Sequence, residues 1–252
     1  MVRRSLSALG VAVVVSAGAV GCSNDTDEAT TVLDVYAAAS LKQAFTEIAD
    51  EYARVHEDVD VRVNFAGSSA LVTQIEQGAT ADVIATADEK TMARLGATAV
   101  DPEIFATNTL VIVTGPGNPE NIVDLASLTN PELSTVVCAV EVPCGAATAQ
   151  VEKNTGIDLE PVSEESSVSA VVAKVTSGQA DAGIVYVTDA RGAGDKVSAV
   201  TDPAFAEVVN AYPIAKVKGS PRQQDAQMFV DLVLGETGAA VLRADGFSPA
   251  PA

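Results

Sequence analysis

The segment Val35-Tyr36-Ala37-Ala38-Ala39-Ser40-Leu41 joins a short apolar run to the start of an amphipathic pattern. The apolar residues that follow have the spacing of one helix face: Leu41, Ala44, Phe45, Ile48, Ala49, Tyr52 and Ala53. This places Ser40 at a helix N-cap, where a serine oxygen ordinarily accepts a backbone N–H. Because three alanines leave space in front of the helix, its free N–H groups and positive dipole end could instead face an anion. The segment therefore fits either an ordinary serine cap or an anion site.

Strand and helix patterns alternate on both sides of this segment. The patterns predict strands at 32–37, 59–65, 81–86 and 109–114, and helices at 41–54 and 71–77. Such alternation is typical of mostly parallel sheets with helices on both faces. The run Gly115-Pro116-Gly117-Asn118-Pro119 then ends the last strand, because glycine and proline interrupt regular structure.

A second alternating block follows, and it predicts a second lobe. Its expected elements are a strand at 136–140, a helix after Gly145, a helix at 168–177 and a strand at 182–187. A return strand at 212–217 and a helical section at 222–244 close the chain. We therefore expect an α/β protein whose lobe 1 comprises residues 32–109 plus 214–252 and whose lobe 2 comprises residues 110–213, with a hinge between them. Ligands of such proteins bind between the lobes, beyond the carboxyl ends of the strands.

The N-terminal residues predict export. Arg3 and Arg4 precede a short apolar run that ends at Gly21-Cys22, as in a signal peptide, and the run is too short for a stable membrane span. Ala19-Val20-Gly21-Cys22 resembles a bacterial lipobox. We expect residues 1–21 to be a lipoprotein-type signal peptide, Cys22 to carry the lipid and residues 22–31 to form a polar tether. The protein would then be extracytoplasmic and anchored to the cell membrane.

The charge of the chain excludes several classes of partner. Its formal net charge is −19, and removal of residues 1–21 takes away two arginines and no acid, which leaves the mature chain near −21. Such acidity argues against nucleic acid or an anionic membrane surface as the main partner. Any bound anion must then be held by local hydrogen-bond donors.

Two cysteines remain after Cys22, namely Cys138 and Cys144, with five residues between them. In an exported protein such a pair predicts a disulfide rather than a metal site, and no CxxC motif or histidine lies nearby. Closing so small a ring would stabilise the fold by roughly 2 kcal/mol. The disulfide would also stiffen the loop around Pro143-Cys144-Gly145.

Four places in the sequence share one local design, in which small or hydroxyl residues lead into a helix. They are Ala39-Ser40-Leu41, Gly67-Ser68-Ser69-Ala70, Pro143-Cys144-Gly145-Ala146 and Ser166-Ser167-Val168-Ser169. Each could present free N–H groups and hydroxyls to one cleft, although each taken singly is an ordinary helix cap.

Longer stretches around these places resemble one protein family. The stretches are VYAAASLKQAF, NFAGSSALVTQIEQGATADVIATAD, VPCGAATAQ, SSVSAVVAKVTSGQADAGIVYVTDA and TGAAVLRADGF. From about Val32 to Phe247 they are similar to the substrate-binding proteins of molybdate ABC transporters. The resemblance implies the two-lobed type II periplasmic binding fold, with mixed, mostly parallel sheets flanked by helices. It also implies delivery of molybdate, and of tungstate, to the membrane permease of an ABC importer, with no enzymatic activity, no cofactor and no metal beyond the bound oxyanion. We expect a monomer.

The resemblance also implies a set of ligand-binding residues. In this numbering they are the hydroxyls of Ser40, Ser68 and Tyr186 and the backbone N–H groups of Cys144 and Val168. Two positions differ from the family pattern. Cys144 replaces the alanine of a Pro-Ala-Gly turn, and Ser169 replaces an arginine that often follows the valine in the family. Neither change removes a backbone donor.

The chemistry of these residues suits a fully deprotonated oxyanion. Molybdate only accepts hydrogen bonds, whereas monohydrogen phosphate also needs an acceptor for its own proton. Sulfate is deprotonated too, so a sulfate or other oxyanion binder stays an alternative, as does a surface lipoprotein with a structural or adhesive role. A serine hydrolase is disfavoured, because the single histidine, His56, lies in a polar stretch and no GxSxG motif is present.

Overall fold

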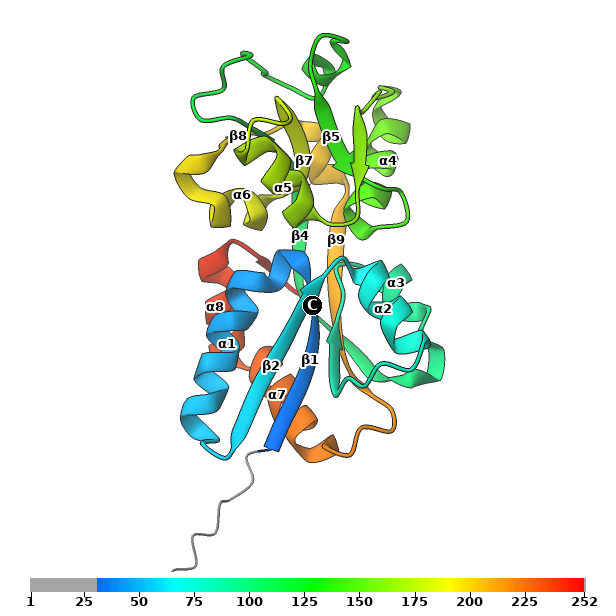
Figure 1. Ribbon diagram of the computed structural model, residues 1–252, viewed down its shortest axis with the longest axis vertical. Helices are drawn as coiled ribbons and strands as arrows, with labels where there is room; N and C mark the ends of the chain where they lie inside the picture. Colours follow the sequence, from blue (N-terminus) through cyan, green and yellow to red (C-terminus); the bar gives the residue numbers. More distant parts are fainter. Residues whose placement is uncertain (1–30, 252) are drawn as a thin grey trace, which may run out of the picture.

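The computed structural model describes residues 31–251. The predicted signal peptide, Cys22 and the tether up to residue 30 lie outside these residues. The described chain forms two halves, each a sheet with helices on both sides, and strands β4 and β9 run between them (Figure 1). Within the described part, no helix has the length and apolarity needed to cross a membrane.

Lobe 1 is the half that contains both ends of the described chain. Its sheet has the order β2-β1-β3-β9-β4, with β10 also paired to β4. The strands are β1 Thr31–Ala38, β2 Val59–Ala66, β3 Val83–Ala85, β4 Ala99–Thr114, β9 Val209–Val217 and β10 Ser248–Pro249. The helices are α1 Lys42–Val55, α2 Ser68–Glu76, α3 Glu89–Ala93, α7 Gln223–Leu234 and α8 Glu236–Asp245. Strand β1 is parallel to β2 and β3, while β9 is antiparallel to its neighbours β3 and β4.

Lobe 2 is built on the second part of β4. Its strands are β5 Thr135–Cys138, β6 Ser163–Glu165, β7 Ala182–Tyr186 and β8 Ser198–Val200, and its helices are α4 Pro143–Thr155, α5 Val168–Thr176 and α6 Val187–Ala193. Strand β5 is parallel to β6 and β7, while β4 is antiparallel to β7 and β8. Five short 3-10 turns complete the described chain: η1 Ala39–Leu41, η2 Gly96–Thr98, η3 Ala126–Thr129, η4 Gly194–Lys196 and η5 Pro203–Glu207. The mixed, helix-flanked α/β architecture predicted from the sequence is confirmed.

The crossing between the lobes consists of the antiparallel strands β4 and β9. Asn108 and Asn210 face each other across this pair, and both side chains are buried. Asn210 donates to the carbonyl oxygen of Ala87 in lobe 1 (3.0 Å), and Asn108 donates to the hydroxyl of Thr188 in lobe 2 (2.8 Å). The two amides therefore tie the crossing strands to opposite lobes. The lobe boundaries predicted near residues 109 and 213 fall within these two strands.

The apolar face predicted for the first helix forms part of the core of lobe 1. Phe45 and Ile48 are fully buried, and Phe45 packs against Phe105 and Phe229 with ring centroids 5.8 and 6.1 Å away. The last residue of the predicted face, Ala53, is exposed, because the helix ends two residues later and extends past the core. Burial of this face supplies the hydrophobic stabilisation that holds α1 against the sheet.

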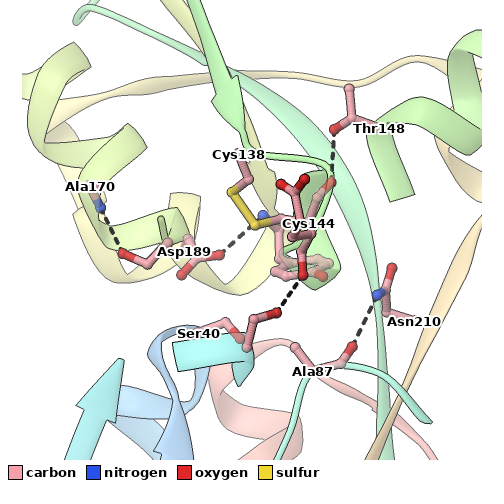
Figure 2. The surroundings of a disulfide bond; sticks show 12 residues. Ser40, Ala87, Cys138, Cys144, Thr148, Ala170, Asp189 and Asn210 are labelled. Carbon is pink, nitrogen blue, oxygen red and sulfur yellow. Dashed lines mark hydrogen bonds between the residues drawn. A yellow bond between two sulfur atoms is a disulfide. The ribbon is translucent and has the colours of Figure 1, made fainter. Parts of the chain in front are cut away.

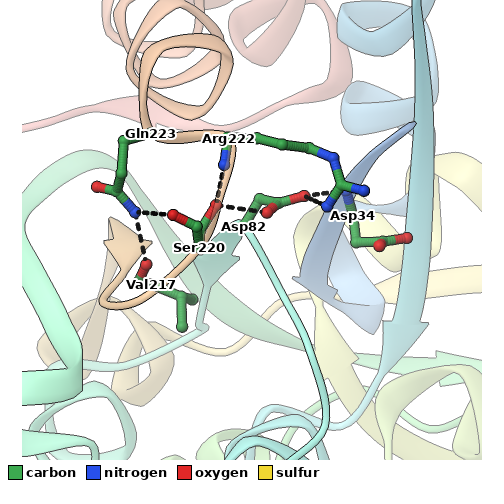
Figure 3. A network of polar contacts seen from close by, with 6 residues as sticks. All are labelled: Asp34, Asp82, Val217, Ser220, Arg222 and Gln223. Carbon is green, nitrogen blue, oxygen red and sulfur yellow. Dashed lines mark hydrogen bonds and ion pairs between the residues drawn. The ribbon is translucent and has the colours of Figure 1, made fainter. Parts of the chain in front are cut away.

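A polar network fixes the chain between β9 and α7 far from the lobe interface (Figure 3). The buried carboxylate of Asp82 accepts bonds from the backbone N–H of Asp34 (2.7 Å) and the hydroxyl of Ser220 (2.5 Å), and Arg222 lies 3.4 Å away. Because a buried carboxylate needs such partners, this network gives lobe 1 a defined connection between its N-terminal strand and its C-terminal helices.

Candidate functional site

All five residues predicted as ligands line one small cavity between the lobes. The centre of a water molecule can move through about 10 Å³ of this cavity, which is the room that a single water molecule needs. A larger guest therefore requires the lobes to move apart. Lobe 1 contributes Ala38, Ala39, Ser40, Gly67, Ser68 and Ala87, and lobe 2 contributes Val142, Pro143, Cys144, Ser167, Val168 and Tyr186. We call this the interlobe cavity.

Helix starts surround the interlobe cavity. The turn η1 that leads into α1 begins at Ala39, α2 at Ser68, α4 at Pro143 and α5 at Val168. The first backbone N–H groups of a helix have no acceptor within it, and each helix start carries a partial positive charge. Cys144 and Val168 occupy the second and first positions of their helices, so their N–H groups belong to this unpaired set. Four helix or turn starts with unpaired N–H groups therefore border the cavity, and no charged side chain lines it.

Tyr186 is the last residue of β7 and is 1% exposed. Its hydroxyl lines the cavity and makes no hydrogen bond of ordinary length among the described residues, although the hydroxyl of Tyr212 is near enough to affect its pKa. Burial raises the pKa of Tyr186 well above its ordinary value, so the hydroxyl keeps its proton and can donate it. A buried polar atom without a partner is uncommon in a folded protein and indicates a missing ligand or water.

Ser40 does not act as the helix cap that its sequence position suggests. The chain makes the 3-10 turn η1 before α1, Ala38 takes the N-cap position, and no side-chain cap bond is present. The Ser40 hydroxyl instead shares a 2.9 Å hydrogen bond with the hydroxyl of Tyr212 on β9 (Figure 2). If Tyr212 donates, the proton of Ser40 is free to point into the cavity.

Tyr212 was not identified as part of the site from the sequence. Its local sequence predicts only a return strand, and no neighbouring residue indicates that its hydroxyl belongs to a binding site. The structure shows that it is fully buried and packs edge-on against Tyr186, with ring centroids 5.9 Å apart. Burial raises its pKa above the ordinary value, so Tyr212 also stays a neutral donor.

Ser68 opens α2 directly after Gly67, and its side chain is 2% exposed. Its oxygen accepts the backbone N–H of Ala87 at 3.0 Å. A hydroxyl that accepts one bond still carries a proton to donate. The contact therefore fixes the side chain and leaves a donor for the cavity.

A disulfide joins Cys138 at the end of β5 to Cys144 in the first turn of α4, as predicted (Figure 2). The start of α4 packs closely on this strand end: a Cβ at Gly145 would lie 2.0 Å from the carbonyl oxygen of Ala139, so only glycine fits there. Thr148 donates to the carbonyl oxygen of Cys144 (2.9 Å). The disulfide and this close packing together hold the backbone of Cys144 at the cavity.

A larger groove of about 490 Å³ adjoins the interlobe cavity and shares Ala39 and Ser40 with it. Lys42, Lys196 and Asp189 line this groove. The carboxylate of Asp189 accepts the backbone N–H of Tyr186 at 3.1 Å. Burial raises the pKa of Asp189 to about 7, so near neutral pH this acid is only partly ionised and adds little negative charge beside the cavity.

A histidine and an acid that could take part in other chemistry do not line the cavity. His56 is the C-cap residue that follows α1, and it packs against Tyr52 with ring centroids 4.3 Å apart. Glu165 pairs with Lys174, and hydrogen bonding to that lysine lowers its pKa. Within residues 31–251, no group of three or more histidines, cysteines or acids could hold a metal ion.

Comparisons with known proteins agree with this geometry. A family model described as bacterial extracellular solute-binding protein matches residues 33–248. Over 217 residues the chain is 49% identical to the molybdate-binding protein ModA of Mycobacterium tuberculosis, which covers 85% of this chain and 83% of that protein.

Two solved structures show the same fold. The periplasmic molybdate-binding protein of Azotobacter vinelandii superposes with a TM-score of 0.76 at 23% identity, covering 87% of this chain and 100% of that one. The sulfate-binding protein SubI of Mycobacterium tuberculosis superposes with a TM-score of 0.76 at 19% identity, covering 87% of each chain. At these identities the likeness concerns the fold and does not distinguish one oxyanion from another.

Proposed function

Because this chain belongs to the family of bacterial extracellular solute-binding proteins that includes the molybdate-binding proteins, we propose that it binds molybdate between its two lobes and delivers it to an ABC importer. The 49% identity to a molybdate-binding protein over most of the chain supports this choice of anion. The sulfate and adhesive alternatives have no comparable support, since the sulfate-binding neighbour is only 19% identical.

One observation carries the proposal, namely the unpartnered hydroxyl of Tyr186 in a cavity that contains hydrogen-bond donors and no charged side chain. Molybdate carries two negative charges and no proton at neutral pH, so all of its oxygens accept hydrogen bonds. A cavity of uncharged donors matches this guest. Monohydrogen phosphate would bring a proton for which the lining side chains offer no carboxylate acceptor, and that proton would lose its partner on binding.

In the proposed complex, the hydroxyls of Ser40, Ser68 and Tyr186 and the N–H groups of Cys144 and Val168 donate to the anion. Hydrogen bonds to a charged group are worth about 1.5–3 kcal/mol each, and the helix dipoles add to them. Five such bonds are enough for micromolar or tighter affinity after the cost of association. The donors come from both lobes, so binding requires the lobes to close.

The finer parts of the function are also proposals. We propose that tungstate, a dianion of the same shape, is bound as well, and that the protein acts as a monomer with no cofactor. The signal sequence supports export and a lipid on Cys22, which would hold the protein beside its permease at the outer face of the membrane.

The direct test is calorimetric titration of protein stripped of anion with molybdate, tungstate, sulfate and phosphate in parallel. The proposal predicts binding of one molybdate per chain, comparable binding of tungstate and much weaker binding of phosphate. Binding of sulfate alone would make the protein a sulfate carrier. Binding of none of the four would favour the adhesive role and reject the proposal.

A further inference from the structure

Gly67 lies at a contact between the two lobes. It is the N-cap of α2 in lobe 1, and a Cβ at this position would lie 2.1 Å from the carbonyl oxygen of Ser166 in lobe 2. That separation would have to grow by roughly 1 Å or more to reach ordinary contact. The backbone angles of Gly67, φ −58° and ψ 135°, are ones that any residue adopts. Glycine is therefore needed here for the approach of the lobes, and the conformation of lobe 1 does not require it.

Ser69 makes a second contact between the lobes. Its hydroxyl donates to the backbone carbonyl oxygen of Glu141, in the segment that leads into α4. Ser68, the proposed ligand, stands between Gly67 and Ser69 in the sequence. One helix start therefore lines the cavity with its first residue and contacts the opposite lobe with the residues on either side.

We propose that Gly67 and Ser69, with their partners Ser166 and Glu141, form a closure latch that sets how far the lobes close and how long the anion is retained. The latch needs no contact with the anion. Gly67 and Ser69 are thus positioning residues for binding. This inference rests on the proposed function, because retention is defined for the bound oxyanion.

The latch acts mainly on release. Its contacts require closed lobes, so their loss shortens the lifetime of the closed complex and speeds dissociation, while the rate at which the anion meets the open protein stays unchanged. A Cβ at Gly67 prevents full approach, which reduces the population of the binding-competent closed state. Loss of the Ser69 hydroxyl removes one hydrogen bond and leaves the approach possible.

The test compares Gly67→Ala and Ser69→Ala with two matched controls. In Gly115→Ala the new Cβ would meet only Pro119, at 3.8 Å, and in Thr46→Ala the lost hydroxyl bonds a carbonyl of its own helix. Molybdate affinity is measured by calorimetry, and association and dissociation rates by stopped-flow tyrosine fluorescence. Spin labels attached after the changes Asp50→Cys in α1 and Lys153→Cys in α4, both at exposed positions, report the distance between the lobes.

We expect Gly67→Ala to weaken binding at least about 10-fold and Ser69→Ala about 3- to 10-fold, both through faster dissociation. Gly67→Ala should also lengthen the distance between the lobes in the presence of molybdate without lowering the melting temperature of the free protein. The controls should match the wild type.

If Gly67→Ala and Ser69→Ala both matched the wild type in molybdate affinity, dissociation rate and distance between the lobes, the inference would be overturned. The proposed function would still stand in that case. If the wild type bound no molybdate, the proposed function would fail, and the spin-label distances would still decide the latch. In that case, a distance between the lobes that is the same in Gly67→Ala as in the wild type would reject the closure latch.

Discussion

The change Tyr186→Phe separates a ligand-binding role from a structural one. It removes one oxygen and keeps the ring that packs on Tyr212. In the free closed protein the Tyr186 hydroxyl is buried without a partner, and such a group costs about 1–3 kcal/mol. In the complex it would donate to an anion, a bond worth about 1.5–3 kcal/mol. The variant should therefore bind molybdate roughly 10- to 150-fold more weakly and be at least as stable as the wild type when no anion is present.

Two assays measure these opposite effects. Calorimetric titration with molybdate gives the affinity, and urea unfolding of protein stripped of anion gives the free energy of unfolding. Tyr52→Phe is the matched control, because Tyr52 is equally buried and its hydroxyl donates to the carbonyl oxygen of Asp225, far from the cavity. The control should lose some stability and no affinity. Wild-type affinity in Tyr186→Phe would refute the assignment of this hydroxyl to the anion.

The remaining predictions concern other parts of the site. Ser40→Ala and Ser68→Ala should each weaken molybdate binding by about 1–3 kcal/mol in calorimetry with the circular dichroism spectrum unchanged; wild-type binding by either would remove that serine from the site. The double change Cys138→Ser with Cys144→Ser should lower the free energy of unfolding in urea by about 2 kcal/mol and weaken binding, because the start of α4 loses its covalent attachment; unaltered affinity would show that close packing alone positions it. Burial raises the pKa of Asp189 from 3.8 to about 7, so its stabilising contribution is fully present below pH 4 and is lost as the pH rises through 7. Asp189→Asn should remove this loss, and identical pH profiles of stability for variant and wild type between pH 5 and 8 would contradict the effect.

Local sequence patterns predicted much of the fold, because they depend on neighbours along the chain. The spacing of Phe45 and Ile48 predicts which face of α1 is buried. The disulfide between Cys138 and Cys144 was predictable because an export signal accompanies a single cysteine pair that lacks a CxxC motif or a nearby histidine. The break between α7 and α8 falls at Gly235, one of the two glycines that interrupt the last helical pattern.

Contacts between distant segments could not be read in this way. The partner of Ser40 is Tyr212, which is 172 positions away, and the contact of Gly67 with Ser166 depends on how the lobes meet. Strand β4 is longer than the predicted segment 109–114, because its first part contains Pro102 and register shifts that hide the strand pattern. The five ligand candidates came from resemblance to a family, and the structure adds that they share one cavity.

The central claim is that uncharged donors of both lobes hold one tetrahedral oxyanion in the interlobe cavity. Crystals grown with molybdate, with diffraction recorded at the molybdenum absorption edge, test it most directly. We expect a single anomalous peak among the hydroxyls of Ser40, Ser68 and Tyr186. A peak in the neighbouring groove beside Lys42 and Lys196, or no peak at all, would contradict it.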